Sequence, residues 1–187
     1  MVPLIVFVII IVIVLLLLIW YISTANHFAR IAVKIKESES GIDVALTKRY
    51  SVLTKMLDVC REFSAHETAA FAKVIALRQG MSIAERQAAD AQMTEMTGKI
   101  NLLAEAYPEL KSSAVFVELQ KGIRDVEEHL QAARRFYNAN VSEMNQALAV
   151  YPQSIVGKQK GYVPYEFYQA EEQHRKDVKM TMKTNEY

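Results

Sequence analysis

The chain begins with an uninterrupted apolar segment, Leu4–Ile22, which ends in Trp20, Tyr21 and Ile22. A helix of these 19 residues, at about 1.5 Å per residue, spans about 28 Å, close to the hydrocarbon thickness of a bilayer. Trp and Tyr are enriched at the membrane–water interface. The pattern therefore predicts a transmembrane helix, with residues 1–25 as an N-terminal anchor.

A cleaved signal peptide is the alternative interpretation, because residues 23–25 (Ser-Thr-Ala) resemble a small-residue cleavage site. However, no Lys or Arg precedes the apolar run, and the run is longer than the roughly 7–15 apolar residues of a signal peptide. A buried core helix is a second alternative, but no other segment is apolar enough to surround it. We therefore expect the segment to stay in the membrane.

The basic residues near the anchor predict its orientation. Arg30, Lys34 and Lys36 follow the apolar run, whereas only the amino terminus precedes it. Because cytoplasmic flanks carry the excess of Lys and Arg, we expect the N-terminus outside and the following domain in the cytoplasm. These three residues also favour general adhesion to anionic headgroups, although specific lipid recognition usually uses about four to eight basic residues.

After the anchor, apolar positions recur every three or four residues, which is typical of an amphipathic helix. The helix is expected to run to about Gln79, with a possible break at Ser38–Gly41 and with Gly80 at its C-terminal cap. The predicted stripe is Phe28, Ile31, Ile35, Ile42, Leu46, Tyr50, Leu53, Leu57, Cys60, Phe63, Phe71, Val74 and Ile75.

A second helix is predicted from a capping box at Ser82–Glu85 to about Tyr107, where Pro108 ends it. Its first half, Ala84–Ala91, is small and polar, so we expect looser or more solvated packing there. The stripe of this helix is Met93, Met96, Ile100, Leu103 and Tyr107.

The clearest periodicity predicts a third helix that stops at Pro152. Its stripe is Phe116, Leu119, Ile123, Val126, Leu130, Ala133, Tyr137, Val141, Met144, Leu148 and Tyr151. Three long helices with short connections predict an all-α fold, with an antiparallel helical bundle over residues 26–152.

Residues 153–187 are predicted to form an irregular, aromatic-containing extension and a polar tail. Gly157, Gly161 and Pro164 mark irregular chain, and residues 169–187 form a polar tail of mixed charge. The aromatic residues of the extension, which we expect to pack back on the bundle, are Tyr162, Tyr165, Phe167 and Tyr168.

Composition excludes several classes of protein. The chain has 22 Lys and Arg against 21 Asp and Glu, so it lacks the basic excess of a dedicated nucleic-acid binder, and we expect no nucleic-acid partner. A single cysteine, Cys60, excludes a disulfide scaffold. Only 6 Gly and 4 Pro argue against a β-sandwich or barrel.

The residues that could carry chemistry do not form a convincing site. Glu171 and His174 make one Glu-x-x-His pattern in the polar tail, whereas a di-metal bundle needs this pattern on two helices. The other histidines, His27, His66 (followed by Glu67) and His129, are separated in sequence. We therefore predict no catalytic, cofactor-binding or metal-binding residue, and no cofactor.

Cys60 and two basic pairs also have structural explanations. Cys60 lies on the apolar stripe, which favours a buried small side chain over a nucleophile. Lys48–Arg49 and Arg134–Arg135 flank stripe positions, which is typical of a solvated face or of interhelical ion pairs.

Several motifs occur in an order and spacing that resemble the LemA family from about residue 42 to 168. They are Asp43-Val44-x-Leu46-x-Lys48-Arg49-Tyr50, Phe63-x-Ala65-His66-Glu67, Val74-Ile75-Ala76-x-Arg78, Glu105-Ala106-Tyr107-Pro108-Glu109-Leu110-Lys111, Phe116-x-x-Leu119-Gln120, Ala133-Arg134-Arg135-Phe136-Tyr137-Asn138, Asn145 and Tyr151-Pro152.

The chain departs from the family pattern in two places. Leu53–Met56 stands where a Pro-Asn-Leu element usually follows the Arg-Tyr region, and Lys36–Gly41 replaces an Asn- and Trp-containing lead-in. Both differences are expected at the membrane-proximal start of the bundle, which puts a function located there in doubt.

The resemblance implies a single-pass membrane protein with its N-terminus outside and an α-helical cytoplasmic domain, in a cell inner membrane or an organelle membrane. It implies no activity, because the family has no established catalytic function, although some members are associated with bacterial organelle membranes or envelope stress. Because a long helix is joined to the anchor and no set of reactive groups converges, we expect a non-enzymatic, self-associating scaffold in the lipid bilayer that organises the membrane or recruits partners. An adaptor or regulator of a membrane protease or envelope-stress signalling protein is the alternative, with the segment Tyr162–Tyr168 and the polar tail recognising another membrane protein.

Overall fold

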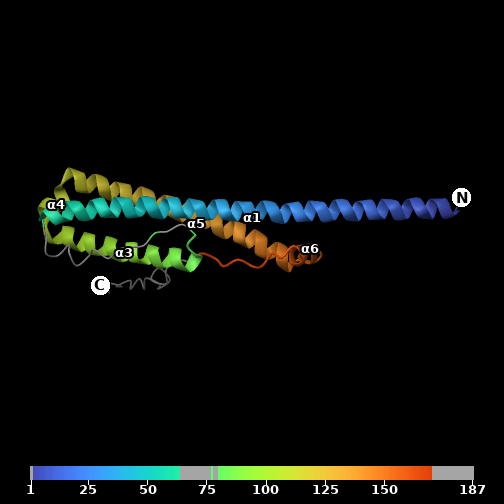
Figure 1. Ribbon diagram of the computed structural model, residues 1–187. Coiled ribbons are helices and arrows are strands. Elements are labelled where there is room, and N and C mark those ends of the chain that lie inside the picture. Colours follow the sequence, from blue (N-terminus) through green and yellow to red (C-terminus); the bar gives the residue numbers. More distant parts are fainter. Residues whose placement is uncertain (1, 64–76, 78–79, 170–187) are drawn as a thin grey trace, which may run out of the picture.

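The computed structural model describes residues 2–63, 77 and 80–169, and every regular element in those residues is an α-helix. The prediction of an all-α fold is therefore confirmed. Figure 1 shows the elements arranged along one very long helix. The helices are α1 (Val2–Phe63), α3 (Ile83–Ala106), α4 (Pro108–Ser112), α5 (Ala114–Ala149) and α6 (Gln153–Gln159).

Helix α1 joins the apolar N-terminal segment to the bundle without interruption. It has 62 residues, which corresponds to about 93 Å at 1.5 Å per residue. The break considered at Ser38–Gly41 is absent, because α1 is continuous over these residues. Ile35 and Ile42, on either side of them, are fully buried. That packing offsets the intrinsic cost of Gly41 in a helix, which is about 1 kcal/mol.

The first part of α1 is long and apolar enough to cross a membrane. Its most apolar 18-residue window has a mean hydropathy of 3.6, and none of that window is buried inside the structure. The two departures from the family pattern lie further along the same helix, at Lys36–Gly41 and Leu53–Met56. Leu53 is 31 residues beyond Ile22, or about 46 Å along the axis. Our expectation that this second departure lies close to the membrane is therefore wrong.

Helix α5 is antiparallel to α1, whereas an up-down-up order of the three predicted helices would make these two parallel. Lys34 of α1 lies 3.9 Å from Glu143, whereas Arg49, further along α1, lies 3.0 Å from Glu127, which is earlier in α5. The alternating apolar positions of the two helices form one shared seam.

Helix α3 runs in the same direction as α1, which differs from the expected antiparallel bundle. Arg86 of α3 contacts Asp43, and Thr94, two turns later, contacts Arg49. Both helices therefore advance together, and Figure 1 shows α3 and α5 lying beside the distal part of α1.

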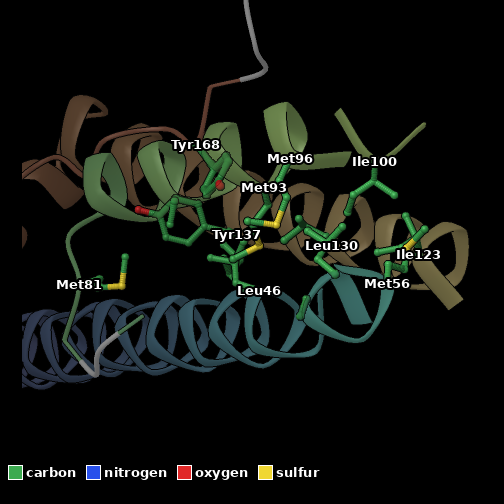
Figure 2. Close-up of a cluster of buried hydrophobic side chains, with 14 of the residues drawn as sticks. Leu46, Met56, Met81, Met93, Met96, Ile100, Ile123, Leu130, Tyr137 and Tyr168 are labelled. Atoms are coloured by element: carbon green, nitrogen blue, oxygen red, sulfur yellow. The ribbon is translucent and has the colours of Figure 1, made fainter. Parts of the chain in front are cut away.

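The predicted stripes form the hydrophobic core. Figure 2 shows Leu46, Met93, Leu130 and Tyr137 converging from the three long helices. One stripe position is wrong: Tyr151 is 76% exposed, because α5 ends at Ala149 and the chain turns before this residue.

The helix boundaries follow local signals. Ser82 Oγ accepts a hydrogen bond from the Glu85 backbone N–H (3.2 Å), and Glu85 Oε2 accepts one from the Ser82 N–H (2.7 Å). The predicted capping box is therefore confirmed. Gly80 adopts a φ of 76°, which suits a glycine cap. Pro108 ends α3 as expected and also begins α4 as its first residue.

The extension contains a helix that was not predicted. Residues 153–159 form α6, with Val156 and Gly157 buried against the bundle. Of the aromatic residues, Tyr162, Tyr165 and Tyr168 pack on the core as expected, whereas Phe167 is exposed. The predicted stripe positions Phe71, Val74 and Ile75, the helix end near Gln79 and the tail beyond Gln169 lie outside the described residues.

Candidate functional site

A buried carboxylate, Asp90, lies at the point where the three long helices meet. Its side chain and that of Arg49 are both 3% exposed. Asp90 Oδ1 accepts a hydrogen bond from Arg49 Nη1, and Asp90 Oδ2 accepts one from Arg134 Nη2. The carboxylate therefore joins α1 and α5 through α3.

Arg49 uses its remaining donors on neighbouring groups. Its Nη2 lies 3.0 Å from Glu127 Oε2 and donates a hydrogen bond of 3.1 Å to Thr94 Oγ1. Its Nη1 also donates to the Asp90 backbone carbonyl at 3.4 Å. These partners satisfy the two terminal nitrogens, Nη1 and Nη2, of a buried arginine, which cannot lose its charge.

The C-terminal segment completes this cluster. The Tyr168 hydroxyl lies 3.3 Å from Asp90 Oδ2 as a hydrogen-bond donor, and the Arg134 guanidinium lies 5.0 Å from the centre of the Tyr168 ring. We call Arg49, Asp90, Glu127 and Arg134 the ion network. Its two positive and two negative charges cancel, which is the condition under which buried charges are tolerated.

A second ion pair, between buried Arg86 and partly exposed Asp43, joins α3 to α1 closer to the apolar segment. Arg86 donates to both carboxylate oxygens of Asp43, from Nε at 2.7 Å and from Nη2 at 2.8 Å. These hydrogen bonds raise the pKa of Arg86 further. Because Arg86, Ala89 and Asp90 are all buried, the expectation of solvated packing over Ala84–Ala91 is wrong.

Two asparagines hold the C-terminal segment against α5. Asn138 bonds both the N–H (2.8 Å) and the carbonyl (2.9 Å) of Tyr168. Asn145 does the same with Tyr165, at 2.9 Å for each bond. In each case a side-chain amide pairs with a backbone amide as a neighbouring strand would, which fixes the segment in register.

Burial changes the titration of two further groups. Desolvation raises the pKa of the Tyr137 phenol to about 12, and this hydroxyl donates a hydrogen bond of 2.9 Å to the Glu166 carbonyl. Desolvation also raises the pKa of the Cys60 thiol to about 11. Cys60 is fully buried, which agrees with the prediction of a small core side chain.

A pocket of about 840 Å³ opens beside the ion network, between α3 and α5. Its lining includes three of the four network residues, Arg49, Glu127 and Arg134. Arg124 and Arg135 add two positive charges. The described residues that line it with an amide or a hydroxyl group are Thr94, Thr97, Asn101, Gln120, Gln131, Asn138, Tyr168 and Gln169.

The side chains that line the pocket contribute both hydrogen-bond donors and acceptors and the aliphatic groups that carry them. Guanidinium groups suit carboxylate or phosphate oxygens, and amides suit a peptide backbone. The described residues of the lining therefore suit the recognition of a polar or acidic group.

The structure separates the histidines that sequence analysis considered. His27 lies 3.9 Å from Glu143, whereas His129 is exposed on α5. In the part of the chain that the structure describes, no group of three metal-ligating side chains occurs. His66, Glu67, Glu171 and His174 lie outside that part.

Each of the two basic pairs, Lys48–Arg49 and Arg134–Arg135, has one member in the ion network and one exposed member. Arg49 and Arg134 form interhelical ion pairs, one of the two interpretations given above, whereas Lys48 and Arg135 are exposed. Asp90 itself was not predicted. The only local signal for it was an acidic residue on the helix face that also carries the apolar stripe.

Comparison with known proteins agrees with the motifs. The profile of the LemA family matches residues 38–182. A protein named LemA from Metamycoplasma hominis is 24% identical over 163 residues, which covers 84% of this chain and 74% of that protein. Because the family match extends over most of the chain, this protein belongs to the LemA family.

Proposed function

We propose that this protein is a non-enzymatic, membrane-anchored scaffold whose copies associate and thereby organise the membrane or recruit partners. The observation that supports the proposal is the continuity of α1, which runs as one helix from the apolar segment into the bundle core. A helix without a hinge transmits the orientation of its membrane end to the whole domain.

Anchoring favours association between copies. Confinement to a surface raises the effective concentration, so weak contacts suffice for assembly. The bundle carries exposed apolar side chains on each long helix that are available for such contacts. Examples are Val33, Val44, Leu102, Val115 and Phe136.

The number of copies per assembly tests the proposal directly. We would extract the full-length protein from its native membrane in polymer-bounded lipid discs and measure particle masses. We expect discs with several copies, and the copy number should persist when the lipid-to-protein ratio is increased. Discs that each hold a single copy at native abundance would contradict the scaffold.

A hinge introduced into α1 distinguishes the effect of membrane anchoring from the effect of helix continuity on the arrangement of the bundles. Replacing Ile22 and Ser23 with Gly and Pro removes a helical hydrogen bond and bends the joint, whereas replacing both with Ala keeps the helix and its length. By electron microscopy we expect the Gly-Pro variant to lose the uniform orientation of bundles relative to the membrane. The Ala-Ala variant should keep it. Equal order in both variants would argue against a mechanical role for α1.

An adaptor function is the second candidate, and the arginine-lined pocket favours it. The pocket is concave and carries polar side chains on a largely apolar lining, and it adjoins the C-terminal segment at Tyr168 and Gln169. An acidic segment of another membrane protein would match the two uncancelled charges of Arg124 and Arg135.

Site-specific photo-crosslinking discriminates this candidate from the scaffold. A photoreactive amino acid at Arg124 in the full chain should form one discrete heteromeric product in native membranes if the protein is an adaptor. The same probe at Lys55, an exposed position of α1 outside the pocket lining, is the matched control. Products that contain only this chain would support the scaffold instead.

A further inference from the structure

Because α1 is one continuous helix, residue positions along it give the distance between the apolar segment and the bundle. The apolar run ends at Ile22, and the side chains from Leu4 to Ile19 are all exposed. Burial against the bundle begins at Thr24, which is 7% exposed, and is complete at Phe28. These positions are two and six residues after Ile22, which correspond to about 3 and 9 Å along the axis. The bundle therefore begins where the apolar segment ends.

The C-terminal end of α5 and helix α6 form this end of the bundle. The Phe28 ring stacks on Tyr162, with 5.4 Å between ring centres, and α6 approaches Phe28 closely at Gly157. Because Glu143 contacts His27 and α5 is antiparallel to α1, residues after Glu143 point back toward the apolar segment. Figure 1 shows α6 at the end of the bundle closest to that segment.

This end of the bundle exposes apolar side chains although the neighbouring positions are well packed. Val150 and Ile155 are each 54% exposed, and Tyr151 is 76% exposed. In contrast, Val156, the residue after Ile155, is only 1% exposed. Three large exposed apolar side chains lie within six residues here, whereas Val115 and Val117 of α5 form only a pair. Such clustering marks a contact surface.

The same region carries mainly positive charge. From Met144 to Tyr165 the sequence contains no Asp or Glu, and its two charged residues, Lys158 and Lys160, are exposed. Arg30 and Lys34 on α1 are also exposed at this level. The facing acid is Glu143, which lies 3.9 Å from both His27 and Lys34.

We propose that Val150, Tyr151, Ile155, Lys158 and Lys160, here called the membrane foot, lie in the interfacial layer of the bilayer that α1 spans. This inference rests on the anchoring that the proposed function assumes. The interfacial layer adds several ångströms beyond the hydrocarbon on each side, which matches the level of Thr24 and Phe28. Its occupant is that bilayer, because the foot continues the apolar surface of α1 and its lysines complement anionic headgroups.

The foot gives the domain a second attachment to the membrane. A single helix lets a domain rotate about the helix axis and tilt with it. A second contact beside that axis fixes which face of the bundle turns toward the lipid. Lys158 and Lys160 add to Arg30, which lies eight residues after Ile22, or about 12 Å along the axis, and each basic residue near the surface contributes about 1 kcal/mol of attraction to anionic lipids.

Spin labels on single introduced cysteines test the foot in the full-length chain. Native Cys60 is fully buried, so the chain without an introduced cysteine gives the background. Labels at Val12, Ile155 and Val44 would be compared in vesicles of phosphatidylcholine and phosphatidylglycerol. Accessibility to oxygen, which concentrates in lipid, would be divided by accessibility to a water-soluble nickel complex.

We expect the label at Ile155 to give an oxygen-to-nickel ratio several-fold above that at Val44, which is equally part of the bundle but about 33 Å beyond Ile22. A lipid-like ratio at Val12 with a water-like ratio at Ile155 would overturn the foot and leave the anchor intact. A water-like ratio at Val12 would overturn both.

A charge variant, measured with the same label at Ile155, tests the contact with anionic headgroups. Lys158→Glu with Lys160→Glu should lower the ratio at Ile155 in phosphatidylglycerol vesicles. The matched control, Lys55→Glu with Lys121→Glu, reverses two exposed lysines at the distal end of the bundle and should leave that ratio unchanged. An equal response to both pairs would contradict headgroup contact by the foot.

Discussion

The carboxylate of Asp90 on α3 accepts a hydrogen bond from the guanidinium group of Arg49 on α1, and both side chains are almost completely buried. This pair joins α1 and α3 although the two residues are 41 positions apart in the sequence. Arg134 of α5 and Tyr168 of the C-terminal segment bond the same carboxylate. Four parts of the chain therefore depend on one acidic side chain.

We predict that Asp90→Ala lowers the free energy of unfolding by about 3–5 kcal/mol, because the ion network would keep two arginines, Arg49 and Arg134, but only one acid, Glu127. Urea unfolding of the full chain in detergent, followed by circular dichroism, measures this loss. Asp58→Ala is the control. It breaks an exposed pair with Arg61 and should cost at most about 1 kcal/mol. Similar losses in the two variants would show that the ion network is not a central support of the fold.

We predict that Asn145→Ala frees the segment around Tyr165 without unfolding the bundle. Two hydrogen bonds of 2.9 Å to the Tyr165 backbone are lost, and each is worth about 1 kcal/mol. Hydrogen exchange followed by mass spectrometry should show faster exchange over residues 162–169. In Asn140→Ala, which loses a bond to Ser38 on α1, exchange over those residues should stay slow. Unchanged exchange in Asn145→Ala would contradict this attachment.

The elements that follow from local periodicity were predictable. The apolar stripe of α5 and the capping box at Ser82 depend on residues a few positions apart. The ion network depends on residues more than 40 positions apart, so Arg49 could be assigned an interhelical pair but not its partner. The polar start of α3 suggested solvation, because a charged residue indicates burial only once its counter-charge is known.

Helix α6 was missed for a related reason. Gly157, Gly161 and Pro164 are signals of irregular chain, yet Gly157 lies inside α6 and is buried. The requirement for glycine there comes from distant residues. A Cβ at this position would lie 2.6 Å from Leu148 Cδ2 and 2.8 Å from Phe28 Cζ. Sequence alone gives no way to distinguish a glycine required for close packing from one that ends a helix.

We therefore predict opposite effects for two glycine substitutions. Gly157→Ala should lower the free energy of unfolding by about 1–3 kcal/mol, because Phe28 is fully buried and has little room to move. Gly98→Ala, in α3, meets no heavy atom within 4 Å and should raise it by up to about 1 kcal/mol through helix propensity. Thermal unfolding of both variants measures the difference. Stabilisation by Gly157→Ala would contradict the packing of α6 on Phe28.

The last prediction concerns alkaline pH. Burial raises the pKa of Cys60 from 9.0 to about 11 and that of Tyr137 from 10.0 to about 12. The native state therefore keeps two protons that the unfolded chain begins to release near pH 9 and 10. Native-state stabilisation from these groups is complete below that range and is lost as pH rises toward 11 and 12. Urea unfolding between pH 7 and 11 should show a falling free energy above pH 9. In Cys60→Val the thiol contribution disappears, so the decline should be shallower between pH 9 and 10, where Tyr137 contributes least. An identical slope in this variant would show that Cys60 does not carry the effect.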